Sequence, residues 1–230
     1  FRWRRQSALR LHPEVVMSSK SAPSAAAAPV AAVASTSPSY TPIQQRIVGC
    51  LRVFLGEQAA PLYEAHGRSL QRLAAFARDS GLPGCQELST GLALAQALLA
   101  EAMSSAPVFD SPAAVTDFLK LHFAGQAYES FVVVFLDARH QLIVVEDVFR
   151  GTLTQTSVYP REILKRALHH NAAAVILAHN HPSGSTDPSR ADETLTETLR
   201  STLSLIDVRV LDHLIIAGNA SLSFAQRGLL

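Results

Sequence analysis

The chain has 230 residues, of which 48% are hydrophobic, so it is long enough for one well-packed core and an accessory region. Its formal net charge of +1 argues against a strongly basic nucleic-acid-binding surface, and we expect any DNA binding to be weak. No apolar run reaches the ~18–20 residues of a membrane span, and the two isolated cysteines, Cys50 and Cys85, suit a reducing compartment.

The first part of the chain is predicted to contain no stable structure, and the second to be helical. Residues 1–42 form an expected disordered lead-in, because alanine, serine and proline dominate its second half. The first methionine is Met17, so residues 1–16 are either an upstream extension or part of a longer reading frame. From 43 to 105 apolar residues recur at helical spacing, which predicts a small helical domain.

Residues 107–230 alternate between helical and strand-like patterns and are expected to form the main domain. Ser111 and Pro112 predict the start of its first helix. Further helices are predicted from Pro160 to His170 and from Ser189 to about Leu205. Runs rich in β-branched residues predict strands at about 131–136, 142–149, 173–178, 208–211, 214–217 and 221–224. The expected fold class is α/β, with a mixed β-sheet between helices.

A cluster of potential metal ligands follows the predicted strand 173–178. His179 and His181 leave the same face of an extended chain roughly 6.5 Å apart, close enough to converge on one ion. Asp192 falls in the first turn of the next helix, from which it can point back at the histidines. Two imidazoles and one carboxylate leave the fourth tetrahedral position of a zinc ion open, which is typical of catalytic zinc.

Each of these residues also has an ordinary structural interpretation. Ser189 and Asp192 fit a capping box, in which the serine is the N-cap and the acid lies three residues later. His179 alone fits a hydrogen-bonded histidine at a strand end. The pair of histidines together with the acid favours the metal site, because several independent structural reasons would otherwise have to coincide.

The spacing His-x-His-Pro, six residues, Ser-x-x-Asp resembles the JAMM (MPN-plus) metalloprotease motif, and the chain matches every fixed position. Over about residues 107–230 it resembles the RadC family of bacterial JAMM-domain proteins more narrowly. The matching segments are Phe149–Thr152, Val158–Glu162, Asn171–Ala174, His179–Gly184, Asp212–Leu214 and Ser223–Ala225. The resemblance implies the three-layer fold shared with cytidine deaminases, zinc-dependent cleavage of peptide or isopeptide bonds in a peptide or protein substrate, and a bacterial cytoplasmic protein.

The JAMM resemblance also implies a glutamate that acts as general acid/base above the metal-bound water. Glu146, three residues before Phe149, is the predicted residue, and Asp147 is its rival on the opposite side of the strand. Ser189 is predicted to stabilise the oxyanion of the tetrahedral intermediate, beside or instead of its role as N-cap. His213 fits either a partner of the metal ligands or a packed structural residue.

Two other functions remain open from the sequence. One is a DNA repair or recombination accessory protein, the role that gave the RadC family its name. Its usual helix-hairpin-helix-like element is degenerate here, since only Gly81–Gly84 stands where the Gly-x-Gly turn is expected. The other is a protein-binding module in which zinc is only structural.

Overall fold

The structure is a computed structural model that describes residues 39–108, 112–151 and 158–230. The predicted lead-in up to residue 38 and the predicted cap Ser111 lie outside these residues. Tyr40–Leu230 forms one compact unit. Among the described residues, no helix combines the length and apolar character that crossing a membrane requires.

The helical region consists of four α-helices and one short 3-10 helix. Their bounds are α1 Pro42–Leu55, η1 Gly56–Gln58, α2 Ala59–Ala65, α3 Leu70–Asp79 and α4 Cys85–Ser105. Side-chain caps define two of the starts, because Thr41 forms a capping box with Gln44 before α1 and Ser69 accepts a hydrogen bond from the backbone of α3. These helices enclose a core of their own, built from Val48, Leu51, Leu55, Ala59, Tyr63, Leu73, Ala77, Cys85 and Leu88.

A mixed five-stranded sheet forms the centre of the remaining chain. Its elements are α5 Pro112–His122, β1 Ser130–Leu136, β2 Leu142–Arg150, α6 Pro160–His169, β3 Ala174–Asn180, α7 Arg190–Ser204, β4 Arg209–Ala217, β5 Ala220–Ser223 and α8 Phe224–Arg227. The strand order is β2-β1-β3-β4-β5; β3 and β4 are parallel, and the other neighbours are antiparallel. Strand β3 is therefore hydrogen-bonded on both sides.

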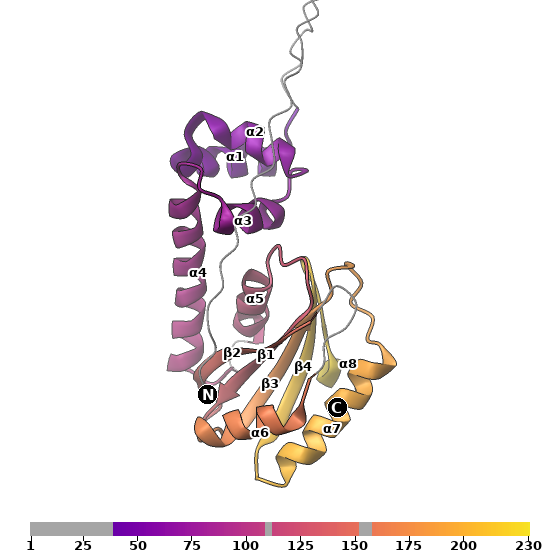
Figure 1. Ribbon diagram of the computed structural model, residues 1–230. Coiled ribbons are helices and arrows are strands. Elements are labelled where there is room, and N and C mark those ends of the chain that lie inside the picture. The colour runs from indigo at the N-terminus through magenta and orange to yellow at the C-terminus, as the bar shows by residue number, and fades with distance from the viewer. Residues whose placement is uncertain (1–38, 109–111, 152–157) are drawn as a thin grey trace, which may run out of the picture. The chain divides into compact units, whose positions relative to one another are not determined.

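Helices cover both faces of this sheet, which confirms the predicted α/β class with a sheet between helices. Figure 1 shows α5 on one face and α6 and α7 on the other. The side chains of β1 and β3 alternate between two cores, as the period of two in a strand requires. Val132 and Ile176 pack towards α5, whereas Val133 and Leu177 pack towards α6 and α7.

Two strands are longer than the sequence pattern predicts. Strand β3 continues beyond residue 178 through His179 and Asn180, because both residues pair with β4. Strand β4 is continuous where two separate runs are expected. The carboxylate of Asp212 explains this, since it accepts hydrogen bonds from the His213 backbone, the Ser223 hydroxyl and the Ala225 backbone. A polar residue therefore remains inside the strand without an unpaired charge.

Candidate metal centre

The end of the central strand β3 positions the two histidines. His179 pairs with Phe131 of β1 and Ile215 of β4 and is only 6% exposed. The His181 backbone donates to the Ile216 carbonyl, at 2.9 Å, so it extends the same strand direction. The period of two turns both imidazoles to one side, where their Nε2 atoms lie 2.9 Å apart.

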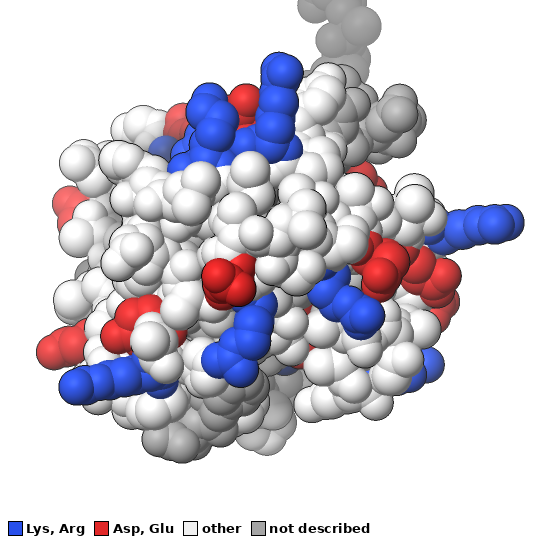
Figure 2. Space-filling view, turned by 90° about the horizontal axis from the view of Figure 1, so that it is seen from below, with Lys and Arg blue, Asp and Glu red and all other residues white. Residues whose placement is uncertain are grey.

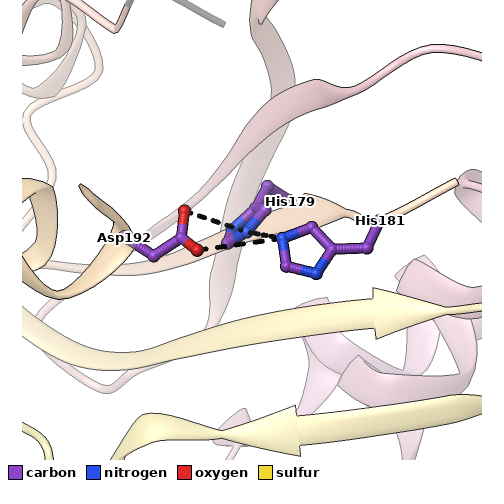
Figure 3. A group of neighbouring side chains, drawn as sticks. All are labelled: His179, His181 and Asp192. Carbon is purple, nitrogen blue, oxygen red and sulfur yellow. Dashed lines mark hydrogen bonds and ion pairs between the residues drawn. The ribbon is translucent and has the colours of Figure 1, made fainter. Parts of the chain in front are cut away.

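The first turn of α7 brings Asp192 to the same point. Its Oδ1 lies 3.3 Å from His179 Nε2 and its Oδ2 lies 3.8 Å from His181 Nε2. One potential ligand atom from each of the three residues lies within 4.8 Å of the others. Figure 3 shows the carboxylate facing both rings. The structure thus assembles the three side chains that the sequence groups as metal ligands.

Asp192 belongs both to the capping box of α7 and to the cluster of candidate ligands. Its Oδ2 accepts hydrogen bonds from the Ser189 backbone at 2.8 Å and the Ser189 hydroxyl at 2.6 Å, and its own backbone donates to that hydroxyl oxygen. Ser189 is thus the N-cap of α7. The two interpretations of this segment are compatible, because capping fixes the carboxylate in the orientation that faces the histidines.

Hydrogen bonds determine which nitrogen of each imidazole faces the cluster, and those around His213 are buried. The Thr196 hydroxyl donates to the Asp192 carbonyl at 2.6 Å, so its oxygen accepts from His213 Nδ1, also at 2.6 Å. His213 Nε2 then accepts from His179 Nδ1 at 2.8 Å. His181 Nδ1 donates to the Ser185 carbonyl at 2.9 Å. Both Nε2 atoms consequently keep a lone pair, which is the form that coordinates a metal.

Burial favours the neutral form of His179 and His213. It lowers the pKa of His179 to about 4, although the Asp192 carboxylate acts in the opposite direction. Burial also holds the pKa of His213 well below its ordinary value, and the neighbouring His179 and His181 add to this effect. His213 is fully buried between Phe131 and Phe224, whose rings lie 5.6 and 4.7 Å from its own.

The structure does not bring the predicted general base, Glu146, to this cluster. Glu146 pairs with Val133, two residues along β1 from the residue beside His179, and its carboxylate contacts Arg166 and His170 of the α6 end. Partial burial acts to raise the pKa of Glu146, but the hydrogen bonds from these two residues outweigh it and lower the pKa.

The rival, Asp147, is also elsewhere. Its Oδ1 lies 2.9 Å from His122 Nε2, and His122 in turn bonds to Gln96 of α4 through Nδ1. The expectation that Asp147 faces the other side of the sheet from Glu146 agrees with this position, since His122 belongs to α5.

A different acidic residue, Glu129, lines the same cavity as the candidate ligands. It lines a cavity of about 460 Å³ together with His179, His181, Ser189 and Asp192. The sequence analysis missed Glu129 because it precedes β1 rather than lying in a strand. The strand register could have found it: Phe131 pairs with His179, so continuing the antiparallel register by two residues places Glu129 opposite His181.

Known proteins match most of this chain. The family described as RadC-like JAB domain matches residues 109–229. A "UPF0758 protein" of Variovorax paradoxus is 62% identical over 144 residues, which are 63% of this chain and 64% of the relative. A "UPF0758 protein" of an Acidovorax species is 55% identical over 170 residues, 74% of this chain and 70% of the relative. One from Nitrosomonas eutropha is 51% identical over 172 residues, 72% and 77% of the two chains. The chain thus spans about two thirds to three quarters of their lengths, and their names state no activity.

Proposed function

The chain belongs to the RadC-like JAB domain family, and from this membership we propose that it is a zinc-dependent hydrolase of peptide or isopeptide bonds. The observation that carries the proposal is the convergence of His179, His181 and Asp192 in the wall of a cavity that Glu129 also lines. A carboxylate beside three potential ligands is the arrangement that metal-assisted hydrolysis needs.

The chemistry of the donor set fits zinc. Two neutral imidazoles and one carboxylate are common zinc ligands, and three protein ligands leave a coordination position open. Hydrogen bonds that Nδ1 of each ring donates already hold both rings with Nε2 towards Asp192. When bound, zinc would acidify a water molecule and polarise the substrate carbonyl.

We assign the general acid/base role to Glu129 instead of Glu146. Glu129 would accept a proton from the attacking water and return it to the leaving amine. Glu146 is engaged by Arg166 and His170, whose hydrogen bonds stabilise its charged form and make it a weaker base.

Ser189 supports the site by holding the Asp192 carboxylate. Its hydroxyl is 2.6 Å from Asp192 Oδ2. The proposed second role, a hydrogen bond to the oxyanion of the intermediate, requires this hydroxyl to turn away from Asp192. Its backbone would still hold the carboxylate, at 2.8 Å.

The other two functions have less support. On the face that Figure 2 shows, lysine and arginine side chains are interspersed with acidic ones, whereas a DNA-binding face is typically enriched in basic residues. A purely structural zinc is typically enclosed by four protein ligands, while His179, His181 and Asp192 line an open cavity.

A matched pair of substitutions tests the proposal. We expect Glu129→Gln to keep the zinc and lose about 10²-fold or more in peptide hydrolysis, because glutamine is nearly isosteric but cannot accept the proton. Glu146→Gln should retain the chemistry, since Glu146 does not line the cavity. His179→Ala should lose both metal and hydrolysis, because two remaining ligands rarely retain the ion. Elemental analysis and cleavage of a peptide library, with and without chelator, provide both measurements.

Three outcomes would contradict parts of this proposal. Full activity of Glu129→Gln would remove Glu129 from the mechanism, and a selective loss of activity in Glu146→Gln would restore the original prediction. A zinc-loaded wild-type chain that cleaves nothing in a broad library would favour the binding module. Active protein without metal above background would rule out the metal site.

A further inference from the structure

A second cavity adjoins the candidate metal centre at His181. Its volume is about 620 Å³, and its walls come from the first turn of α3, the segment after α5, and the loop that follows β3. His181 lines both this cavity and the one that contains Glu129 and Asp192. A substrate bound across the metal centre could therefore extend into this second cavity, which we call the α3 cleft.

The walls of the α3 cleft are joined by direct contacts, so the cleft is built into the fold. Arg78 of α3 donates to the carbonyls of Leu121 and Ala124, at 3.4 and 2.9 Å. The Gln71 amide donates to the Asn219 side chain at 2.9 Å, which connects α3 to the turn after β4.

Four glycines with positive φ line the α3 cleft, and at one of them, Gly184, the absent side chain leaves open space. They are Gly67, Gly125, Gly184 and Gly218, with φ between +60° and +89°. A Cβ on Gly184 would have no neighbour within 4 Å, so close packing does not explain that glycine. Backbone exposed in this way can be approached closely by another chain and can hydrogen-bond its peptide groups.

Arg72 supplies the charge of the α3 cleft. Among the described residues that line it, Arg72 is the only lysine, arginine, aspartate or glutamate. Its side chain is exposed, and no hydrogen bond or ion pair to it is found in the part of the chain that the structure describes. The guanidinium lies beside Gly67, where a Cβ would be 3.3 Å from Nη1. An uncompensated guanidinium matches a carboxylate in charge and in geometry.

We propose that the α3 cleft binds a segment of the substrate peptide and that Arg72 recognises a carboxylate on this segment. The inference rests on the proposed hydrolytic function, because the cleft is a subsite of the same centre. Two sources of the carboxylate share this chemistry: an aspartate or glutamate side chain, and the C-terminus of the peptide. The preferred substrate is therefore acidic on the side of the scissile bond that enters the cleft.

The test is a charge reversal at Arg72 in the zinc-loaded chain of 230 residues. The probes are fluorogenic peptides in which each position in turn carries Glu, Gln or Lys, and in which the C-terminus is either free or amidated. We expect the wild-type kcat/KM to favour glutamate over lysine at one position, or a free over an amidated terminus, by up to about fivefold, the upper range for a solvent-accessible ion pair. Arg72→Glu should invert this preference, and added salt should reduce it.

Arg46→Glu is the matched control, because it makes the same charge change on α1 and lines a different groove. It should leave the preference unchanged. A preference that is the same in wild type and Arg72→Glu, or equally altered by Arg46→Glu, would overturn the assignment of Arg72. A glutamate effect at one position identifies the side chain as the source, and an effect of amidation identifies the C-terminus.

Binding of the same peptides separates the two proposals. Glu129→Gln keeps the ligands of the metal, so peptide binding to its zinc-loaded form can be measured by fluorescence anisotropy without turnover. If the wild type cleaves none of the peptides while Glu129→Gln binds acidic ones through Arg72, the proposed hydrolytic function is refuted and the proposed binding by the α3 cleft is supported. If peptides are cleaved with no dependence on Arg72, the cleft proposal fails alone. If no peptide is cleaved or bound, both fail.

Discussion

Thr196 holds the His213 ring through one buried hydrogen bond, and His213 in turn orients the candidate ligand His179. In Thr196→Val the shape of the side chain is nearly kept, but His213 Nδ1 loses its acceptor. We expect zinc affinity to fall by less than the about 10- to 100-fold that follows removal of a direct partner of a ligating histidine, because Thr196 acts on His179 only through His213. Competition with a chromophoric chelator measures the affinity.

The same helix offers a control for this substitution. Thr198 is exposed on α7, and within the described part of the chain its hydroxyl bonds only to the Thr194 carbonyl, at 2.8 Å. Thr198→Val should therefore bind zinc as the wild type does. Equal affinity in both variants would show that the buried hydrogen bonds do not orient His179.

At the residue scale, the sequence predicts which side chains lie together only where they are close along the chain. His179 and His181 lie in one strand, and Asp192 follows them through a short loop. Glu146 is different, because its place depends on how β2 pairs with β1 across the sheet. A likeness between motifs does not specify how the two strands pair, and the glutamate that lines the cavity is Glu129.

At the scale of elements, a single glycine sets the approach of α3 to the segment after α5. Gly125 has φ +72°, and a Cβ there would lie 2.3 Å from Ala75 Cβ and 2.4 Å from the Gln71 carbonyl. Gly125→Ala combines backbone strain with a clash against a helix backbone. We expect it to lower the free energy of unfolding by about 1–3 kcal/mol more than strain alone.

Gly228→Ala measures the strain alone. Gly228 has a similar φ of +69° and no atom within 4 Å of the added Cβ. Urea denaturation of the two variants gives the difference in unfolding free energy. Equal losses would mean that α3 can move away from Gly125 at little cost.

Most helices and strands follow directly from local patterns. Helix α6 begins at Pro160 and α7 follows its predicted cap, because proline and Ser189 act on their own neighbours. The continuity of β4 could not be predicted, since Asp212 is tolerated there only through partners at Ser223 and Ala225 in the following elements. Contacts with residues further along the chain therefore determine whether a polar residue interrupts a strand or is accommodated in it.

At the scale of the whole molecule, the metal-free fold should become less stable as the pH falls. The pKa of His179 is lowered from 6.5 to about 4 by burial, so between these values the unfolded chain binds a proton that the folded chain does not. The free energy of unfolding should decrease as pH falls from about 6.5 to about 4, by on the order of a few kcal/mol. The shifted pKa of His213 acts in the same direction.

Denaturation of chelator-treated protein across this pH range measures the effect. His179→Gln should flatten the dependence, because glutamine does not titrate. His169→Gln, at the exposed end of α6, is the control and should leave it unchanged. A stability that rises on acidification would reverse the sign argued here.

The candidate ligands come from two layers of the molecule: the histidines from the central strand β3 and its extension, and Asp192 from helix α7. An ion held between them would therefore act as a cross-link between sheet and helix. Local unfolding of the first turn of α7 would have to break both the capping box and the bonds to the metal. Zinc would therefore slow amide hydrogen exchange in this turn. Strand β5, at the far edge of the sheet, takes no part in that unfolding and would exchange at the same rate with or without zinc.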